Sequence, residues 1–338
     1  MLAASFAGCT TVKLLVQAGR GQLELSNKAK PISEVIKNER IDPRIRKLLA
    51  QIPAIKKFSE ASGLKPTSNY TDYVQLDRPA AIWVVSACDP LEFKSKVWDF
   101  PIVGSFPYVG WFNLESAKDY AKGLKSEGYD VNLRGARAYS TLGWFRDAIL
   151  STMIPEGDEA LGELVNVVLH ESVHATLYVK GQSYFDESLA VFVAGKLTYT
   201  YLDSNLGHDS LERKTYAKSE DDSEKVTQKL HALYGKLETV YHSTQTKEEK
   251  LAEKQKLLTA AKEDLGYLKR DLNNATLVQF KEYNVGMPEF ETLFRSCGER
   301  WDRFLVALKK ITPASFAQPQ QEDLAPVLLP LARQGCKN

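Results

Sequence analysis

Apolar residues recur at helical spacing through the first part of the chain. Leucine, isoleucine and valine repeat every three or four positions between residues 10 and 60, and Pro31 fits the first turn of one such segment. Residues at this spacing share one face of a helix, so the pattern predicts several amphipathic helices. Gly63 and Pro66 then end the pattern.

Residues 70–140 change to the pattern of a small sheet. Ala80–Ala87 is a short run of apolar, β-branched and aromatic residues, which is typical of a buried strand. The expected elements are strands at 80–87, 93–100 and 129–139, an irregular Gly-, Pro- and aromatic-rich loop at 103–112, and an amphipathic helix at 115–126. A small sheet with at least one covering helix follows from this order.

Two helices are predicted next, on either side of Gly181. The first, residues 158–180, is apolar nearly all round and is therefore expected to be buried. Gly181 is a typical helix stop signal, and a second helix is expected at 185–202. The short connection predicts an antiparallel pair of packed helices.

Residues 218–272 are highly charged, with leucine and valine repeating at intervals of three, four or seven. This pattern predicts two long antiparallel helices joined near residues 243–247. A solvated charged face is the simplest reading of the charge run, and an arm that binds a protein partner is the alternative.

The remaining residues return to a globular pattern. A helix is expected at 290–308, and the Pro- and Gln-rich tail after Thr312 is expected to be loosely ordered.

The predicted fold class is α+β, mainly α. The expected regions are 1–9, a lipoprotein signal remnant; 10–69, N-terminal helices; 70–202, a zincin-like catalytic core; 203–272, the helical hairpin; and 273–338, a helical part that completes the catalytic domain.

Composition bears on nucleic-acid binding and on membrane spans. The 338 residues carry 44 Lys and Arg against 43 Asp and Glu, a formal net charge of +1. This balance gives no electrostatic case for nucleic-acid binding. No stretch approaches the roughly 20 consecutive apolar residues that span a bilayer.

The predicted buried helix at 158–180 contains His170-Glu171-Ser172-Val173-His174, an H-E-x-x-H motif. Residues four apart share a helical face, so His170 and His174 can present two imidazoles to one metal ion. Glu171 lies beside that face and can reach a metal-bound water. Two satisfied buried histidines are the alternative, but ionisable groups on a buried helix are costly unless something pairs them.

Glu187, on the next predicted helix, is the candidate third ligand. Two His and one Glu around one zinc ion per chain leave the fourth position open for water, as a hydrolytic site requires. Zinc lowers the pKa of that water to about 7, and Glu171 can take its proton as it attacks a peptide carbonyl.

The oxyanion formed in such a reaction needs a second electrophile, and tyrosine is a usual candidate. Tyr178 lies four residues after His174 on the same predicted helical face. Tyr283 lies on a segment that returns after the helical hairpin, and Tyr139 and Tyr184 are weaker candidates. For each tyrosine, a buried aromatic residue with a satisfied hydroxyl is the alternative.

The first residues predict a lipid anchor. Ala3–Cys9 is a run of small and apolar residues ending in Ala-Gly-Cys, similar to a bacterial lipobox, in which the cysteine is lipidated. Phe6 in place of the usual Leu and the absence of a preceding basic residue depart from that pattern. Cys88, Cys297 and Cys336 would then allow one disulfide and one free thiol, and the spacing does not choose the pair.

Taken together, these motifs resemble the gluzincin class of zinc metallopeptidases and, more narrowly, the putative zinc aminopeptidase family of bacterial lipoproteins. The resemblance covers nearly the whole chain. It rests on the residues around Cys9, 21–25, 138–145, the H-E-x-x-H helix, 185–190 and 273–283. It implies that His170, His174 and Glu187 bind zinc, that Glu171 is the base, and that Tyr283 rather than Tyr178 stabilises the oxyanion. It also implies a lipid anchor in the cell envelope, facing the periplasm.

Two departures from better-known gluzincins bear on substrate choice. Asp186 stands where those enzymes have Asn before the third ligand. Residues 138–143 contain no acid to bind a substrate's free amine, although Ser140, Thr141, Leu142 and Gly143 can form an edge strand that pairs with substrate backbone. The prediction is therefore a zinc peptidase acting on peptides, and an aminopeptidase by resemblance. The alternatives are a zinc endopeptidase or other amide hydrolase, and a non-catalytic envelope scaffold that uses the helical hairpin.

Overall fold

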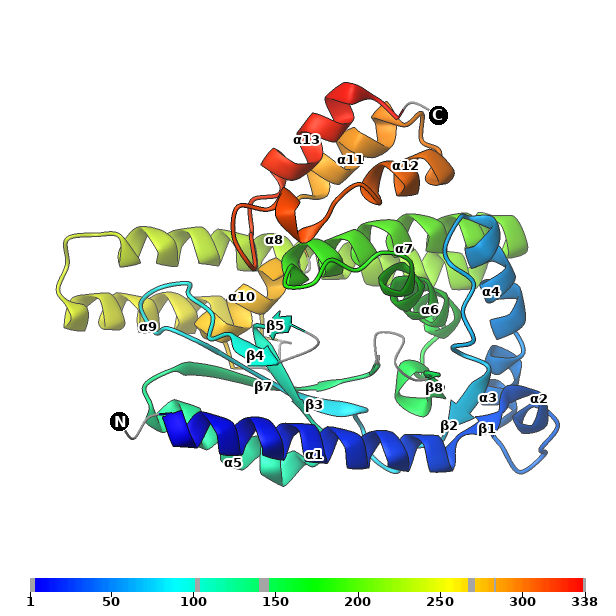
Figure 1. The fold of residues 1–338 in the computed structure, drawn as a ribbon, viewed down its shortest axis with the longest axis horizontal. Helices are drawn as coiled ribbons and strands as arrows, with labels where there is room; N and C mark the ends of the chain where they lie inside the picture. Colours follow the sequence, from blue (N-terminus) through cyan, green and yellow to red (C-terminus); the bar gives the residue numbers. More distant parts are fainter. Residues whose placement is uncertain (1–3, 101–103, 140–145, 267–270, 283, 337–338) are drawn as a thin grey trace. The chain divides into compact units, whose positions relative to one another are not determined.

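The computed structural model describes residues 4–100, 104–139, 146–266, 271–282 and 284–336. The described chain is mostly helical with small sheets, which confirms the predicted α+β, mainly α class (Figure 1). It divides into two compact units. The first comprises the chain up to residue 18, 82–135 and 219–281, and the second comprises 19–81, 136–218 and the chain from 282.

A three-stranded sheet forms the centre of the first unit. Its strand order is β6 (Tyr108–Trp111), β3 (Ile82–Cys88) and β7 (Asp130–Ala136), and α5 (Leu114–Ser126) packs against it. Asn113 begins α5 by accepting a 2.9 Å hydrogen bond from the backbone N–H of Ser116. The strands at 80–87 and 129–139 and the helix at 115–126 were therefore predicted close to their actual bounds.

The loop predicted at residues 103–112 is wrong. The segment contains β5 (Gly104–Phe106), which pairs with β4 (Trp98–Phe100), and β6, which pairs antiparallel with β3. Burial alternates along β6, with Val109 and Trp111 in the core. A Cβ on Gly110 would lie 3.0 Å from the side chain of Ile82, so this glycine permits close strand packing instead of breaking the strand.

The predicted helical hairpin is confirmed, and its helices are α8 (Leu211–Tyr241) and α9 (Lys247–Asp264). Thr246 and Glu249 form a capping box at the start of α9. In the first unit, leucines of both helices share a core with α10 (Asn274–Glu282). The buried Lys254 pairs with Asp130 at 2.6 Å, which ties α9 to the start of β7.

The second unit begins with short helices around a small sheet. Its strands, in order, are β1 (Lys30–Pro31), β2 (Asp72–Val74) and β8 (Ile149–Leu150). The helices before β2 are α1 (Ala4–Lys28, in this unit from Gly19), α2 (Ile32–Val35), α3 (Pro43–Leu49) and α4 (Ile52–Ala61), and a 3-10 turn, η1 (Ser151–Met153), follows β8.

The two longest elements wholly within this unit are α6 (Ala160–Thr176) and α7 (Ser183–Leu206), and they pack extensively against each other. In Figure 1, α6 is seen nearly end-on while α7 runs across the view, so the helices cross steeply. The predicted antiparallel pairing was wrong. The six residues between the helices contain an extended segment at Leu177, which sets the second helix at an angle.

The C-terminal part also differs from its prediction. The helix expected at 290–308 is two helices, α11 (Met287–Ser296) and α12 (Trp301–Leu308), separated by Gly298 at φ +68°. The tail was predicted to be loosely ordered, but it forms a 3-10 turn, η2 (Pro313–Ser315), and α13 (Ala325–Gln334), which packs on α11.

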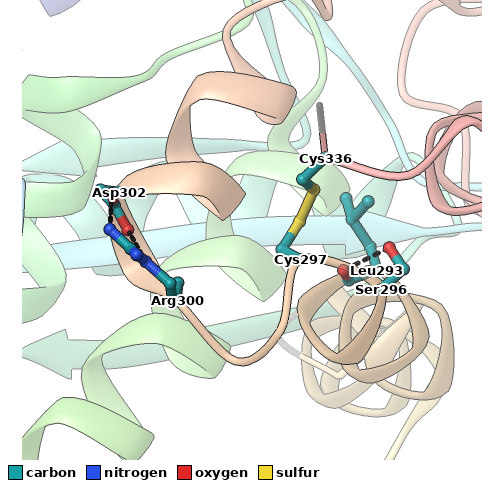
Figure 2. The surroundings of a disulfide bond; sticks show 6 residues. All are labelled: Leu293, Ser296, Cys297, Arg300, Asp302 and Cys336. Atoms are coloured by element: carbon teal, nitrogen blue, oxygen red, sulfur yellow. Dashed lines mark hydrogen bonds and ion pairs between the residues drawn. A yellow bond between two sulfur atoms is a disulfide. The ribbon is translucent and has the colours of Figure 1, made fainter. Parts of the chain in front are cut away.

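A disulfide closes this part of the chain. Figure 2 shows Cys336, just after α13, joined to Cys297 at the end of α11. Cys88 is a buried free thiol in the first unit. The structure thus selects one of the pairings that the sequence left open.

Candidate metal centre

His170 and His174 lie on the same face of α6, in its last two turns. The helix is held in place by leucine and valine side chains that are fully buried, including Leu169 and Val173. The two Nε2 atoms are 3.2 Å apart. The predicted spacing therefore brings the two imidazole nitrogens to one point.

Glu187 reaches the same point from α7. Its Oε2 lies 3.3 Å from His170 Nε2 and 3.7 Å from His174 Nε2. In a tetrahedral site with bonds of about 2.0–2.1 Å, neighbouring ligand atoms lie about 3.3 Å apart. The three atoms are thus spaced as ligands of one metal ion, and this cluster can hold a metal.

The electrostatics of the cluster favour a cation. Burial alone would raise the pKa of Glu187, but His174 and His170 hold it well below its usual range. Burial lowers the pKa of His174, yet Glu187 and Glu171 raise it to about 9. The group as a whole therefore binds positive charge strongly, either as protons or as a metal that displaces them.

Glu171 lies next to this cluster on α6. Burial raises the pKa of its carboxyl group, with the two imidazoles opposing the shift. Among the described residues, its buried Oε2 has no hydrogen-bond partner. A buried carboxylate with a raised pKa and an unoccupied oxygen is suited to accept a proton.

The turn between the helices is built around Asp186. The backbone N–H of Val179 donates a 2.8 Å hydrogen bond to its Oδ1, and Gly181 adopts φ +80°. Burial raises the pKa of Asp186 to about 8. The amide oxygen of Asn, the residue that Asp186 replaces in the resemblance, could accept the same hydrogen bond from Val179.

Glutamine side chains tie the C-terminal segment to this turn. Gln182 donates from Nε2 to the carbonyl of Gln318 at 2.8 Å, and its Oε1 accepts from the backbone N–H of Gln321 at 3.0 Å. Gln320 accepts from the backbone N–H of Ser183 at 2.9 Å. We call these contacts the glutamine clasp. Sequence reasoning missed it, because polar residues in a tail predict exposure and not pairing.

Of the two leading tyrosine candidates, Tyr178 lies within the described residues. Tyr178 does not share the helical face of His174, because α6 ends at Thr176; this prediction is wrong. It is half-buried, and after burial the charges of Asp186 and Glu187 raise its pKa further. Tyr283 lies outside the described residues. Val285 is the second residue after Tyr283. Its backbone N–H donates a 3.1 Å hydrogen bond to Oγ of Ser188, the residue that follows Glu187.

Tyr70 is a buried residue that sequence reasoning did not select. It is 3% exposed and adopts φ +62°, an uncommon conformation that concentrates at functional sites. Burial, followed by the charges of Glu171 and Asp147, raises its pKa well above its usual value. No sequence motif marks it, because its position depends on packing between distant segments.

The remaining predicted site residues are those of the substrate strand and of the lipid anchor. Ser140, Thr141, Leu142 and Gly143 lie outside the described residues. Cys9 lies in α1. Over the described part of the chain, no helix is both long enough and apolar enough to span a bilayer.

A family model described as "Putative aminopeptidase" matches residues 13–323. No curated protein matches this chain. No solved structure matches it either.

Proposed function

This chain belongs to the putative aminopeptidase family, whose model covers most of its length, and on that premise we propose that it is a zinc-dependent aminopeptidase. His170, His174 and Glu187 are the proposed metal ligands. The observation that carries the proposal is the 3.2–3.7 Å spacing of their three ligand atoms beside the unpartnered Oε2 of Glu171.

The donor set favours zinc. Two neutral imidazoles and one carboxylate are a common ligand set of catalytic zinc, whereas magnesium and calcium prefer oxygen ligands. When bound there, zinc would lower the pKa of a water to about 7 and polarise the carbonyl of the scissile bond.

Glu171 would then do the proton chemistry. Its carboxylate accepts the proton of the attacking water and passes it to the nitrogen of the leaving amine. The buried surroundings of Glu171 support this role, because they raise the pKa of its carboxyl group toward the pKa of the water that it deprotonates. A purely structural metal site would have no use for such a base.

A hydroxyl donor would complete the site by stabilising the oxyanion. Tyr283 remains the proposed donor, supported by the contact of the nearby Val285 with Ser188. One such donor is typically worth about 3 kcal/mol of transition-state stabilisation. A Tyr283→Phe variant should therefore lose about 100-fold in kcat with little change in KM.

We also propose that the protein is attached to the bacterial envelope, facing the periplasm, by lipid on Cys9. Incorporation of a fatty-acid probe into the wild type and not into Cys9→Ser would support this attachment. Equal labelling of the two proteins would contradict it.

The experiment for the proposed function is a metal and substrate panel. Purified protein should contain about one zinc per chain and hydrolyse aminoacyl anilides. Chelation should abolish hydrolysis, and added zinc should restore it. Cleavage of N-blocked peptides in place of free-amine substrates would instead identify an endopeptidase or another amide hydrolase. Protein without stoichiometric zinc would contradict the peptidase proposal.

A further inference from the structure

A groove in the first unit lies between α5 and β7. Its volume is about 460 Å³. Pockets that bind ligands typically measure about 300–1,000 Å³. The lining consists of Lys118, Ala121, Lys122 and Lys125 of α5, Val131, Asn132 and Leu133 of β7, and Asp271. We call it the edge groove, because it combines a cationic face of a helix with the edge of a sheet.

The strand that lines the groove is an edge strand. In the three-stranded sheet, β7 has β3 on one side only. The N–H of Ala81, just before β3, donates to the carbonyl of Ala136 at the end of β7, at 2.8 Å. Asn274 bonds both to the carbonyl of Asp89, just after β3, and to Asp130 at the start of β7. The two strands therefore run antiparallel.

The outer edge of β7 is only partly covered. Residues of an antiparallel strand direct their backbone groups alternately to one side and the other. Because Ala136 bonds toward β3, the backbone groups of Val131 and Leu133 face away from it. Nδ2 of Asn273 donates to the outward carbonyl of Val131 at 3.0 Å. No residue of the described chain makes such a contact at Leu133, so its backbone can pair with an added strand.

The opposite edge of the same sheet is already occupied. The side chain of Gln17, on α1, donates to the carbonyl of Gly110 at 2.7 Å and accepts from the N–H of Phe112 at 2.8 Å. One amide thus satisfies both the acceptor and the donor that the end of β6 presents. An added strand would therefore find its partner at β7 and not at β6.

Lysines give the edge groove a positive wall. All three are exposed. Lys118 pairs with Glu115 at 2.8 Å, and the other two have no acidic partner among the described residues. Asp271, the one acid in this lining, pairs with Lys262 at 3.6 Å. The groove therefore attracts negative charge.

The spacing of these lysines matches an extended peptide. Lys118 and Lys122 are one helical turn apart, which is about 6 Å along the axis. Alternate residues of a strand share a face and are about 6.7 Å apart. A short turn joins α5 to β7, and α5 packs against the sheet, so helix and strand run alongside each other. Acidic residues at alternate positions of an added strand would therefore meet successive lysines.

We propose that the edge groove binds an extended acidic peptide segment of a protein partner, which adds to β7 as a further strand. Its backbone pairs with Leu133, and its alternate acids pair with Lys122 and Lys125. A small anion would use the lysines but would leave the strand edge unpaired. The alternative role of the lysines is to keep other sheet edges away from β7, since charged side chains beside an exposed edge oppose aggregation.

The test uses a peptide amide, Thr-Glu-Val-Glu-Val-Glu-Val, capped with fluorescein at its amino end. Fluorescence anisotropy measures its binding to the protein. Wild type should prefer this probe to a peptide of the same composition with its three Glu in one block. Only one of the two sets of alternate backbone nitrogens in the probe faces β7. Methylation of that set should weaken binding at least about 5-fold, and methylation of the other set should be tolerated.

Lysine variants test the charged wall. Lys122→Gln combined with Lys125→Gln should weaken binding of the probe about 5- to 30-fold, the range expected for two exposed ion pairs. The control combines Lys236→Gln with Lys247→Gln, which removes the same charge from exposed positions of the helical hairpin and should bind as wild type does. Circular dichroism checks that both variants keep the fold.

The outcomes that would overturn the proposal are distinct. Equal affinity for the block peptide, or equal weakening in the two pairs of variants, would show non-specific attraction to charge. Equal affinity for both methylated peptides would show that the edge of β7 is not used. Absence of probe binding by wild type would also contradict the proposal. If the variant of Lys122 and Lys125 then dimerises in sedimentation, the lysines guard the edge against a second copy. None of these measurements depends on zinc or on hydrolysis.

Discussion

The Oε2 atom of Glu187 lies 3.3 Å from Nε2 of His170, although the two residues are seventeen positions apart and on different helices. This contact depends on the steep crossing of α6 and α7 and on the short turn between them. It brings a carboxylate to the point where two imidazoles already meet. The candidate metal centre is therefore a property of the helix pair as a whole.

The first prediction concerns this ligand. Glu187→Gln should lower zinc affinity at least about 100-fold. Even the substitution of a residue that only hydrogen-bonds to a metal ligand typically lowers metal affinity about 10- to 100-fold. Competition with a chromogenic chelator measures the affinity. Glu163→Gln changes a carboxylate on α6 that faces Arg137 and should retain wild-type affinity. Equal zinc affinity in Glu187→Gln would remove Glu187 from the ligand set.

Zinc removal should also destabilise the fold. A ligand that binds only the folded state stabilises it by about 4 kcal/mol when present at 1,000 times its dissociation constant. Thermal unfolding should therefore shift to lower temperature on chelation, and the Glu187→Gln protein should show a much smaller shift. A wild-type unfolding temperature that does not respond to zinc would contradict tight binding at this site.

A pH dependence should arise from Asp186. Its pKa is raised by burial from 3.8 to about 8, so the folded protein binds a proton more tightly than the unfolded chain does between these values. The contribution of Asp186 to the free energy of unfolding is therefore highest at low pH. It falls as pH rises from about 4 to about 8, by at most about 1.4 kcal/mol per pH unit.

Asp186→Asn should flatten that part of the stability profile. The amide keeps an acceptor for Val179 and cannot ionise. Chemical denaturation across this pH range, in chelator so that no metal alters the titration, measures the difference. If the wild type and the variant have parallel profiles, Asp186 is ionised in the folded protein and the expectation fails.

The glutamine clasp should support the metal site from a distance. Gln182→Ala removes both hydrogen bonds to the C-terminal segment and should cost about 1–3 kcal/mol of unfolding free energy. It should also weaken zinc binding, because Gln182 immediately precedes α7. The control is Gln318→Ala, since Gln318 is exposed and contributes its backbone carbonyl. Identical zinc affinity in the two variants would show that the clasp is only structural.

The disulfide should stabilise the C-terminal helices. Cys297 and Cys336 are 39 positions apart, and closing a loop of this length contributes up to about 4 kcal/mol in the chain-entropy account. Cys336→Ser should lose part of this stabilisation. In a Cys9→Ser protein, denaturation without reductant should expose the single thiol of Cys88. Three reactive thiols in that experiment would show that no disulfide forms.

The parts of the structure that were predictable are those set by local spacing. His170 and His174 meet because one helix carries both, and Gly181 marks the turn that returns the chain to Glu187. The hairpin of α8 and α9 was predictable for the same reason, since its leucines repeat over many turns.

The parts that were missed depend on distant partners. Glycine in β6 indicated a loop, but Ile82 on the neighbouring strand needs the space that Gly110 leaves. The helix with the histidines ends two residues before Tyr178, because the chain becomes extended at Leu177. The edge groove joins lysines of α5 to a strand edge and to Asp271, far along the chain, so no sequence pattern marks it.

The most direct test of the proposed zinc peptidase is the Glu171→Gln variant. Gln keeps the size of the side chain but cannot accept the proton of the attacking water. Zinc content and hydrolysis of leucine 4-nitroanilide are measured on the same preparation of wild type and variant. We predict about one zinc per chain in both proteins and a loss of at least about 1,000-fold in kcat for the variant, within the range expected for a general base combined with orientation of the water. Wild-type activity in a zinc-loaded Glu171→Gln protein would contradict the account.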